Sequence, residues 1–88
     1  MLTKQELIQE LVQIITTSLN MPLPEEPVTE HTPLGEGGIG LDSIKIIELV
    51  VRLETNFGVT VPDEQLKQIY DYSIGQLSEL IATKAGTP

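Results

Sequence analysis

The sequence predicts an all-α fold: a small bundle of three principal helices and one short helix, with a long loop between the first and second helices. The chain has 88 residues, which suffices for one domain with one core. Hydrophobic residues make up 40% of it and aromatic residues only 3%, so the core must be built from Leu, Ile and Val. Apolar residues recur at helical spacing in three segments, and no pair of alternating segments indicates a sheet.

The first helix is expected from about Thr3 to Leu19. Thr3 and Glu6 have the spacing of a capping box, in which each side chain accepts a hydrogen bond from the other residue's backbone. The apolar residues that follow are spaced for one helix face: Leu7, Ile8, Leu11, Val12, Ile15 and Leu19.

The next segment, residues 20–42, cannot hold regular structure for long because prolines and glycines punctuate it. They are Pro22, Pro24, Pro27, Pro33, Gly35, Gly37, Gly38 and Gly40. A connection of roughly twenty residues exceeds the usual length. We therefore expect it either to be functional or to return the chain across the domain.

The second helix is expected from Ser43 to Phe57, where Gly58 supplies a left-handed stop. Residues 59–61, Val-Thr-Val, have no partner segment and are interpreted as an extended connector. Pro62 and Asp63 then begin a short helix that holds Leu66 and Ile69.

Ser73 and Gln76 form a second capping box, which opens the last helix. Its apolar face consists of Ile74, Leu77, Leu80 and Ile81. The folded domain is expected to span residues 1–84, and residues 85–88 a flexible tail that ends in Gly-Thr-Pro.

Acidic residues dominate the charge of the chain. Thirteen Asp and Glu against five Lys and Arg leave a net charge of −8, which repels nucleic acids and anionic membranes. Proteins with basic patches are the natural partners. There is no cysteine, so cysteine does not constrain the redox compartment. No window reaches transmembrane length, so we expect a soluble, cytoplasmic chain without membrane insertion. We also expect it to be a monomer.

Residues 35–40, Gly-Glu-Gly-Gly-Ile-Gly, match the glycine pattern of dinucleotide-binding folds. That pattern requires a preceding strand, whereas here a proline-rich loop precedes it, and Glu36 would face a pyrophosphate. A Walker loop also fails because no lysine precedes Ser43. Flexible turns that lead into a helix are the favoured interpretation.

Ser43 lies where the second helix begins, next to unsatisfied N–H groups and the positive end of the helix dipole. An anion such as a phosphodiester on the Ser43 oxygen would be stabilised there. The simpler interpretation is that Asp42 or Ser43 is only an N-cap. The two roles are compatible.

Catalysis by the chain itself has little support. A nucleophilic serine needs a nearby base, and the only histidine, His31, lies in the long loop beside Glu30, where a solvated side chain is expected. Neither a histidine cluster nor a calcium-binding loop is present in the sequence. We therefore predict no catalytic residue, no metal site and no enzyme activity.

The second helix has a wider apolar arc than one core contact requires. One stripe consists of Ile46, Val50, Leu53 and Phe57, and a second of Ile44, Ile47 and Val51. The second stripe is either buried in a central helix that packs on two sides or exposed as a docking face or groove wall. Glu48 and Arg52 have the spacing of an intrahelical ion pair.

Residues 40–44, Gly-Leu-Asp-Ser-Ile, together with Ile-Glu-Leu-Val at 47–50, Leu53-Glu54 and Phe-Gly-Val at 57–59, resemble the acyl carrier protein family. The resemblance extends from the first helix through Val-Pro-Asp-Glu at 61–64 to the last helix.

The resemblance implies that Ser43 carries a 4′-phosphopantetheine arm, which a phosphopantetheinyl transferase transfers from coenzyme A. Acyl chains would be held on its thiol as thioesters, which supplies the sulfur that the cysteine-free chain lacks. It further implies that Asp42 assists recognition by the transferase. Partner enzymes would be acyltransferases, ketosynthases or acyl-activating enzymes, and the matching docking positions are Ile44, Ile47, Glu48, Val51 and Glu54.

The chain departs from the family at Lys45, where many fatty-acid carriers have an acidic residue, and its acidity lies mainly outside the second helix. Lys45 is therefore predicted as a docking residue that sets the choice of partner. The favoured function is a free-standing acyl carrier of fatty acid, polyketide or related specialised synthesis. The alternatives are an aminoacyl or peptidyl carrier with the same arm and an unmodified acidic helical adaptor.

Overall fold

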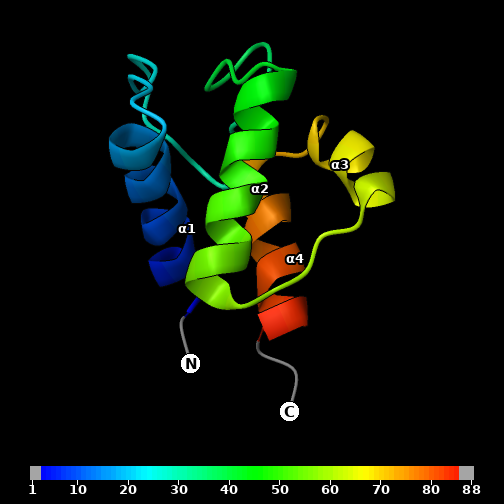
Figure 1. The fold of residues 1–88 in the computed structure, drawn as a ribbon. Helices are drawn as coiled ribbons and strands as arrows, with labels where there is room; N and C mark the ends of the chain where they lie inside the picture. Colours follow the sequence, from blue (N-terminus) through cyan, green and yellow to red (C-terminus); the bar gives the residue numbers. More distant parts are fainter. Residues whose placement is uncertain (1–2, 86–88) are drawn as a thin grey trace.

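The computed structural model describes residues 3–85 and confirms the all-α bundle (Figure 1). Its elements are α1 (Lys4–Gln13), a π-helical turn η1 (Ile14–Ser18), α2 (Ser43–Phe57), the short α3 (Asp63–Ile69) and α4 (Ile74–Ala85). α1 packs against α4, and α2 contacts both η1 and α3. The predicted tail falls partly outside the described residues, since α4 includes Ala85 and residues 86–88 are not described.

The first helix begins at the predicted capping box. The Glu6 amide donates to Thr3 Oγ1 at 3.1 Å, and the Thr3 amide donates to Glu6 Oε1 at 3.0 Å. These hydrogen bonds lower the pKa of Glu6 because they favour its charged form, and the bond from the Thr3 backbone has the largest effect. The N-terminal boundary follows from this local chemistry.

The end of the first helix differs from the expected α-helix. The Leu19 amide donates to the Ile14 carbonyl at 3.2 Å, which is the wider register of a π turn. The Thr16 hydroxyl donates to the Val12 carbonyl at 3.0 Å, so threonine side chains compete with amides for the acceptors of this turn. Asn20, at φ 55°, then turns the chain out of the helix.

The long loop returns the chain across the domain to the start of α4. The Leu34 amide donates to the Tyr72 carbonyl at 3.0 Å, and the Ile74 amide donates to the Thr32 carbonyl at 2.8 Å. A further bond from Gly75 to the Glu30 carbonyl measures 2.9 Å. A Cβ at Gly75 would lie 2.5 Å from that oxygen, so only glycine fits there.

The glycine-rich part of the loop is more regular than the flexible turns that the sequence predicts. Three backbone bonds of 2.9 Å close it, from Ile39 to the Pro33 carbonyl, from Gly40 to Gly35 and from Leu41 to Leu34. Leu34, Ile39 and Leu41 are buried in the core. A Cβ at Gly38 would lie 2.1 Å from the Pro33 carbonyl, so this glycine permits a close approach of backbone. The loop therefore delivers the chain to α2 through a built turn.

The core is aliphatic, as predicted from the composition, and every element contributes to it. Its fully buried hydrophobic side chains are Leu11, Ile15, Leu34, Ile46, Leu49, Leu53, Ile69, Ile74, Leu77 and Ile81. Residues 59–61 form the expected extended connector, in which Val59 and Val61 are also buried. α4 opens at the predicted capping box, where the Gln76 amide donates to Ser73 Oγ at 3.2 Å.

Candidate functional site

Ser43 is the first residue of α2, and Asp42 is its N-cap. The Asp42 carboxylate accepts a hydrogen bond of 2.8 Å from the Lys45 amide, which decides between the two cap candidates that the sequence leaves open. Because Asp42 performs the capping, the Ser43 hydroxyl is not needed for it. Ser43 is exposed, and its hydroxyl has no hydrogen-bond partner among residues 3–85.

The surroundings of Ser43 suit a phosphodiester. Within the described part of the chain, the amides of Ser43 and Ile44 have no acceptor, while the Lys45 and Ile46 amides are used by Asp42. Two free donors at the positive end of a helix of fifteen residues favour an attached anion. The residues present therefore fit a phosphopantetheine group on the Ser43 oxygen.

The two apolar stripes of α2 have opposite environments. Ile46, Val50 and Leu53 are at most 5% exposed and belong to the core, together with Leu49. Ile44, Ile47 and Val51 are 66%, 51% and 53% exposed. The alternative of a central helix buried on two sides is therefore wrong. We call the surface of Ile44, Ile47 and Val51 the exposed stripe.

The polar residues of α2 pair differently from the sequence expectation. Lys45 Nζ lies 3.6 Å from Glu48 Oε2, and it also donates to the Leu19 carbonyl at 3.4 Å. The expected Glu48–Arg52 pair is not formed in the described structure. Lys45 lies on the same helix face as Glu48, and the neighbouring end of η1 offers it a second acceptor.

Glu54 has a structural contact that its position on the helix does not reveal. Its Oε2 accepts a hydrogen bond of 3.0 Å from the Val61 amide and so fastens the connector between α2 and α3. The side chain is half-buried, unlike those of the exposed stripe. No local pattern predicts this bond, because it depends on how the connector folds back.

His31 lies in solvent, as predicted. Its side chain is 86% exposed, and Nε2 lies 3.8 Å from Glu30 Oε1. No interaction joins it to Ser43 within residues 3–85. The dinucleotide motif also lacks its strand, because Pro33 pairs with Ser73 only in an isolated bridge. Among the described residues, no three His, Cys, Asp or Glu side chains are grouped to hold a metal ion.

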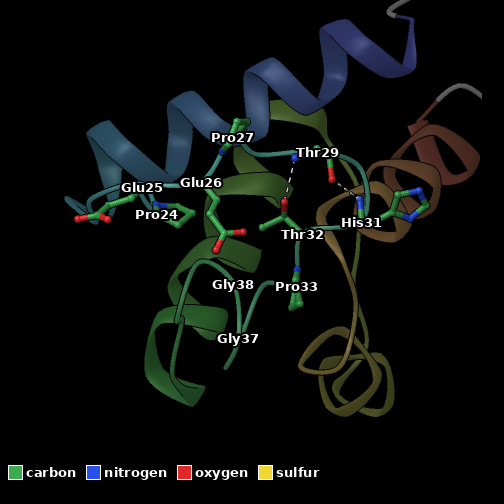
Figure 2. Close-up of a pocket in the computed structure, with 10 residues that line it drawn as sticks. All are labelled: Pro24, Glu25, Glu26, Pro27, Thr29, His31, Thr32, Pro33, Gly37 and Gly38. Atoms are coloured by element: carbon green, nitrogen blue, oxygen red, sulfur yellow. Dashed lines mark hydrogen bonds between the residues drawn. The ribbon is translucent and has the colours of Figure 1, made fainter.

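A hollow of about 570 Å³ lies within the long loop rather than at Ser43 (Figure 2). Pro24, Glu26 and Thr32 line it, together with Glu25, Pro27, Thr29, His31, Pro33, Gly37 and Gly38. In Figure 2 the Glu26 side chain points toward the turn at Gly37 and Gly38. None of the lining residues comes from α2, so this hollow is separate from the site at the start of that helix.

Comparison with known proteins agrees with this site. Residues 9–82 match a family model described as a phosphopantetheine attachment site. The chain is 31% identical to the acyl carrier protein of Petrotoga mobilis, with 89% of this chain and 91% of that protein aligned. The chain belongs to the acyl carrier protein family. It is a carrier that contains a phosphopantetheine attachment site, not a catalyst.

A second bacterial acyl carrier protein aligns over its whole length, and its family shares the fold. The acyl carrier protein of Thermotoga maritima is 31% identical, with 98% of this chain and all of that protein aligned. A crystal structure of an acyl carrier protein from the same organism superimposes with a TM-score of 0.77 at 27% identity, covering 92% of this chain and 88% of the other. A chloroplastic acyl carrier protein of Arabidopsis thaliana is 33% identical, and the chain spans 52% of its length.

No helix within residues 3–85 combines the length and the apolar character that crossing a membrane requires.

Proposed function

We propose that Ser43 carries the 4′-phosphopantetheine arm and that the chain is a free-standing, monomeric acyl carrier of the cytoplasm. The arm holds acyl intermediates as thioesters, and the carrier delivers them to separate partner enzymes. The observation that carries this proposal is the Ser43 hydroxyl, which is exposed at the first position of α2 and makes no hydrogen bond with the described residues. It lies inside the segment matched as a phosphopantetheine attachment site.

Asp42 supports loading in two ways in this proposal. It fixes the first turn of α2 through the Lys45 amide and thereby leaves the serine hydroxyl free. It also provides an exposed carboxylate beside the modified oxygen for recognition by the phosphopantetheinyl transferase.

The exposed stripe is the proposed docking surface. Three aliphatic side chains that are each more than half exposed lose contact with water when a partner covers them, which favours association. Glu48 at the rim attracts basic residues of the partner and raises the rate of association. Lys45 and Glu54 lie at the edges, where both side chains also hold the fold.

Partner enzymes that follow from an acyl cargo are acyltransferases, ketosynthases or acyl-activating enzymes. Their pathway is fatty acid, polyketide or related specialised synthesis. Arg52 is an exposed cation that reduces the negative charge of α2, which favours a specialised partner over one that recognises a uniformly acidic helix.

Incubation with coenzyme A and a broad-specificity transferase tests the attachment site. Mass spectrometry should show one added phosphopantetheine group on the wild-type chain and none on Ser43→Ala. Ser18→Ala is the matched control, because Ser18 is also exposed at a helix end and its removal should leave loading complete.

Loading of Ser43→Ala would place the arm elsewhere and contradict the assignment. No mass change on the wild-type chain with several active transferases would favour the unmodified adaptor. Identification of the thioester on protein isolated from its native cell then separates an acyl cargo from an aminoacyl or peptidyl one.

A further inference from the structure

The end of η1 is held by a residue of α2. Leu19 closes the π turn, and the Met21 amide donates back to the Ile15 carbonyl at 3.2 Å across Asn20, which is left-handed. The Leu19 carbonyl accepts a hydrogen bond of 3.4 Å from Lys45 Nζ. The bond joins residues that are 26 positions apart and is partly buried.

Lys45 is bonded through both its backbone and its side chain. Its amide donates to the Asp42 carboxylate at 2.8 Å, which caps α2, while its ammonium reaches the end of η1. The first turn of α2 is thereby joined to the first helix through a single residue. Ser43 lies in that same turn.

We propose that Lys45 is a positioning residue for the loading and unloading of Ser43. It fixes the first turn of α2 against the π-helical end of the first helix, and it is not primarily a charge that partner enzymes recognise. The proposal rests on the assignment of Ser43 as the attachment site.

Geometry and charge both argue for this role over a docking role. Side chains two positions apart on a helix point in nearly opposite directions, so Lys45 acts on Ser43 through the backbone and not through its ammonium. The Lys45 side chain is 34% exposed, and its ammonium already contacts the Leu19 carbonyl and Glu48, at 3.4 and 3.6 Å. Arg52 is an exposed cation of the same helix with no ion pair in the described structure.

The test compares Lys45→Met with Arg52→Met, because both substitutions remove one positive charge from α2. Steady-state loading by a transferase with coenzyme A gives kcat and KM for each chain, and amide hydrogen exchange reports on Met21. For Lys45→Met we expect kcat to fall about three- to tenfold because Ser43 is less well placed, with KM changed less than about twofold. The Met21 amide should exchange faster.

Further variants separate the tether from general destabilisation. Lys45→Arg keeps a long donor and should restore both kcat and the exchange of Met21 to within about twofold of wild type. Lys45→Gln, which is too short to reach Leu19, should behave like Lys45→Met. Glu48→Gln removes the ion pair but leaves the bond to Leu19, so Met21 exchange should stay at the wild-type level, and any effect on loading should fall on KM because Glu48 lies at the rim of the proposed docking surface.

The proposal is overturned if Lys45→Met and Arg52→Met change KM equally, leave kcat unchanged, and lose this effect on KM at high salt. That result would make Lys45 a docking charge. Wild-type kcat and wild-type Met21 exchange in Lys45→Met would overturn it as well. Failure of the attachment site gives a different result, since either the wild-type chain would not load at all or Ser43→Ala would load as well, while the exchange of Met21 would still respond to Lys45→Met.

Discussion

Single side chains at the helix ends determine which hydroxyl groups of this chain are left free to react. Asp42 supplies the cap of α2, and that leaves the neighbouring hydroxyl of Ser43 unbonded and exposed. Sequence reasoning correctly located the helix start but could not decide between the two residues, because aspartate and serine are equally good caps. The cap assignment needed the positions of the Asp42 carboxylate and the Lys45 amide.

The capping box of α1 makes a testable contribution to acid stability. Its hydrogen bonds lower the pKa of Glu6 below 4.5 in the folded chain, so the stabilisation is present above pH 4.5 and is lost as the pH falls through the folded pKa. Glu6→Gln keeps a side-chain acceptor at the third helical position but cannot titrate. Urea unfolding between about pH 7 and about pH 3 should show a smaller loss of stability for Glu6→Gln than for wild type.

Glu10→Gln is the control for this measurement, since Glu10 is an exposed carboxylate of the same helix and makes no cap. Equal acid sensitivity of Glu6→Gln and Glu10→Gln would show that the effect comes from net charge and not from the capping box.

At the scale of elements, α2 divides its side chains between the core and a partner surface. The periodicity of the sequence separated the two stripes. The bounds of α2 follow from its caps, Asp42 and Gly58, and the start of α4 follows from the capping box of Ser73 and Gln76. The π turn of the first helix could not be predicted, because its apolar residues also fit the spacing of an ordinary α-helix. The bonds of Lys45 and Glu54 were also beyond sequence reasoning, since each depends on a segment folded back against α2.

The neighbours Ile46 and Ile47 provide a matched pair for the two faces of α2. Ile46 is 2% exposed and Ile47 is 51% exposed. Ile46→Ala should lower the free energy of unfolding by about 2–5 kcal/mol, because it opens a cavity in the core. Ile47→Ala should change it by less than about 0.5 kcal/mol.

Chemical denaturation measures this difference in the free energy of unfolding. Ile47→Ala should also raise the KM of loading, because the docking surface loses apolar area, and transferase kinetics measure that change. An unchanged KM for Ile47→Ala would argue against docking on the exposed stripe.

At the scale of the whole molecule, the net charge of −8 opposes the compact state. Lys4 offsets part of it locally, lying 3.0 Å from Glu79 and 3.6 Å from Glu30, and so connects α1, α4 and the loop. The hydrogen bond to Glu79 is the main reason that the pKa of Lys4 is raised above 10.5. Sequence reasoning gave the excess of acid but not this contact, which joins residues distant in the chain.

Salt should stabilise the folded chain because it screens the excess of like charges. We expect the midpoint of thermal unfolding, followed by circular dichroism, to rise between about 10 mM and about 150 mM NaCl. The double variant Glu25→Gln/Glu26→Gln, which lacks two exposed carboxylates of the loop, should show a smaller rise. A midpoint that falls with salt would mean that ion pairs such as those of Lys4 outweigh the repulsion.

The first part of the long loop, residues 22–28, and its second part, residues 30–41, differ in a way that matters for labelling the protein. The backbone of residues 22–28 makes no hydrogen bond within the described structure, whereas residues 30–41 are bonded repeatedly to one another and to the start of α4. A peptide tag inserted between Leu23 and Glu26 therefore interrupts no backbone hydrogen bond within residues 3–85. It would allow binding of the carrier to its partner enzymes to be followed from a position separate from both Ser43 and the exposed stripe.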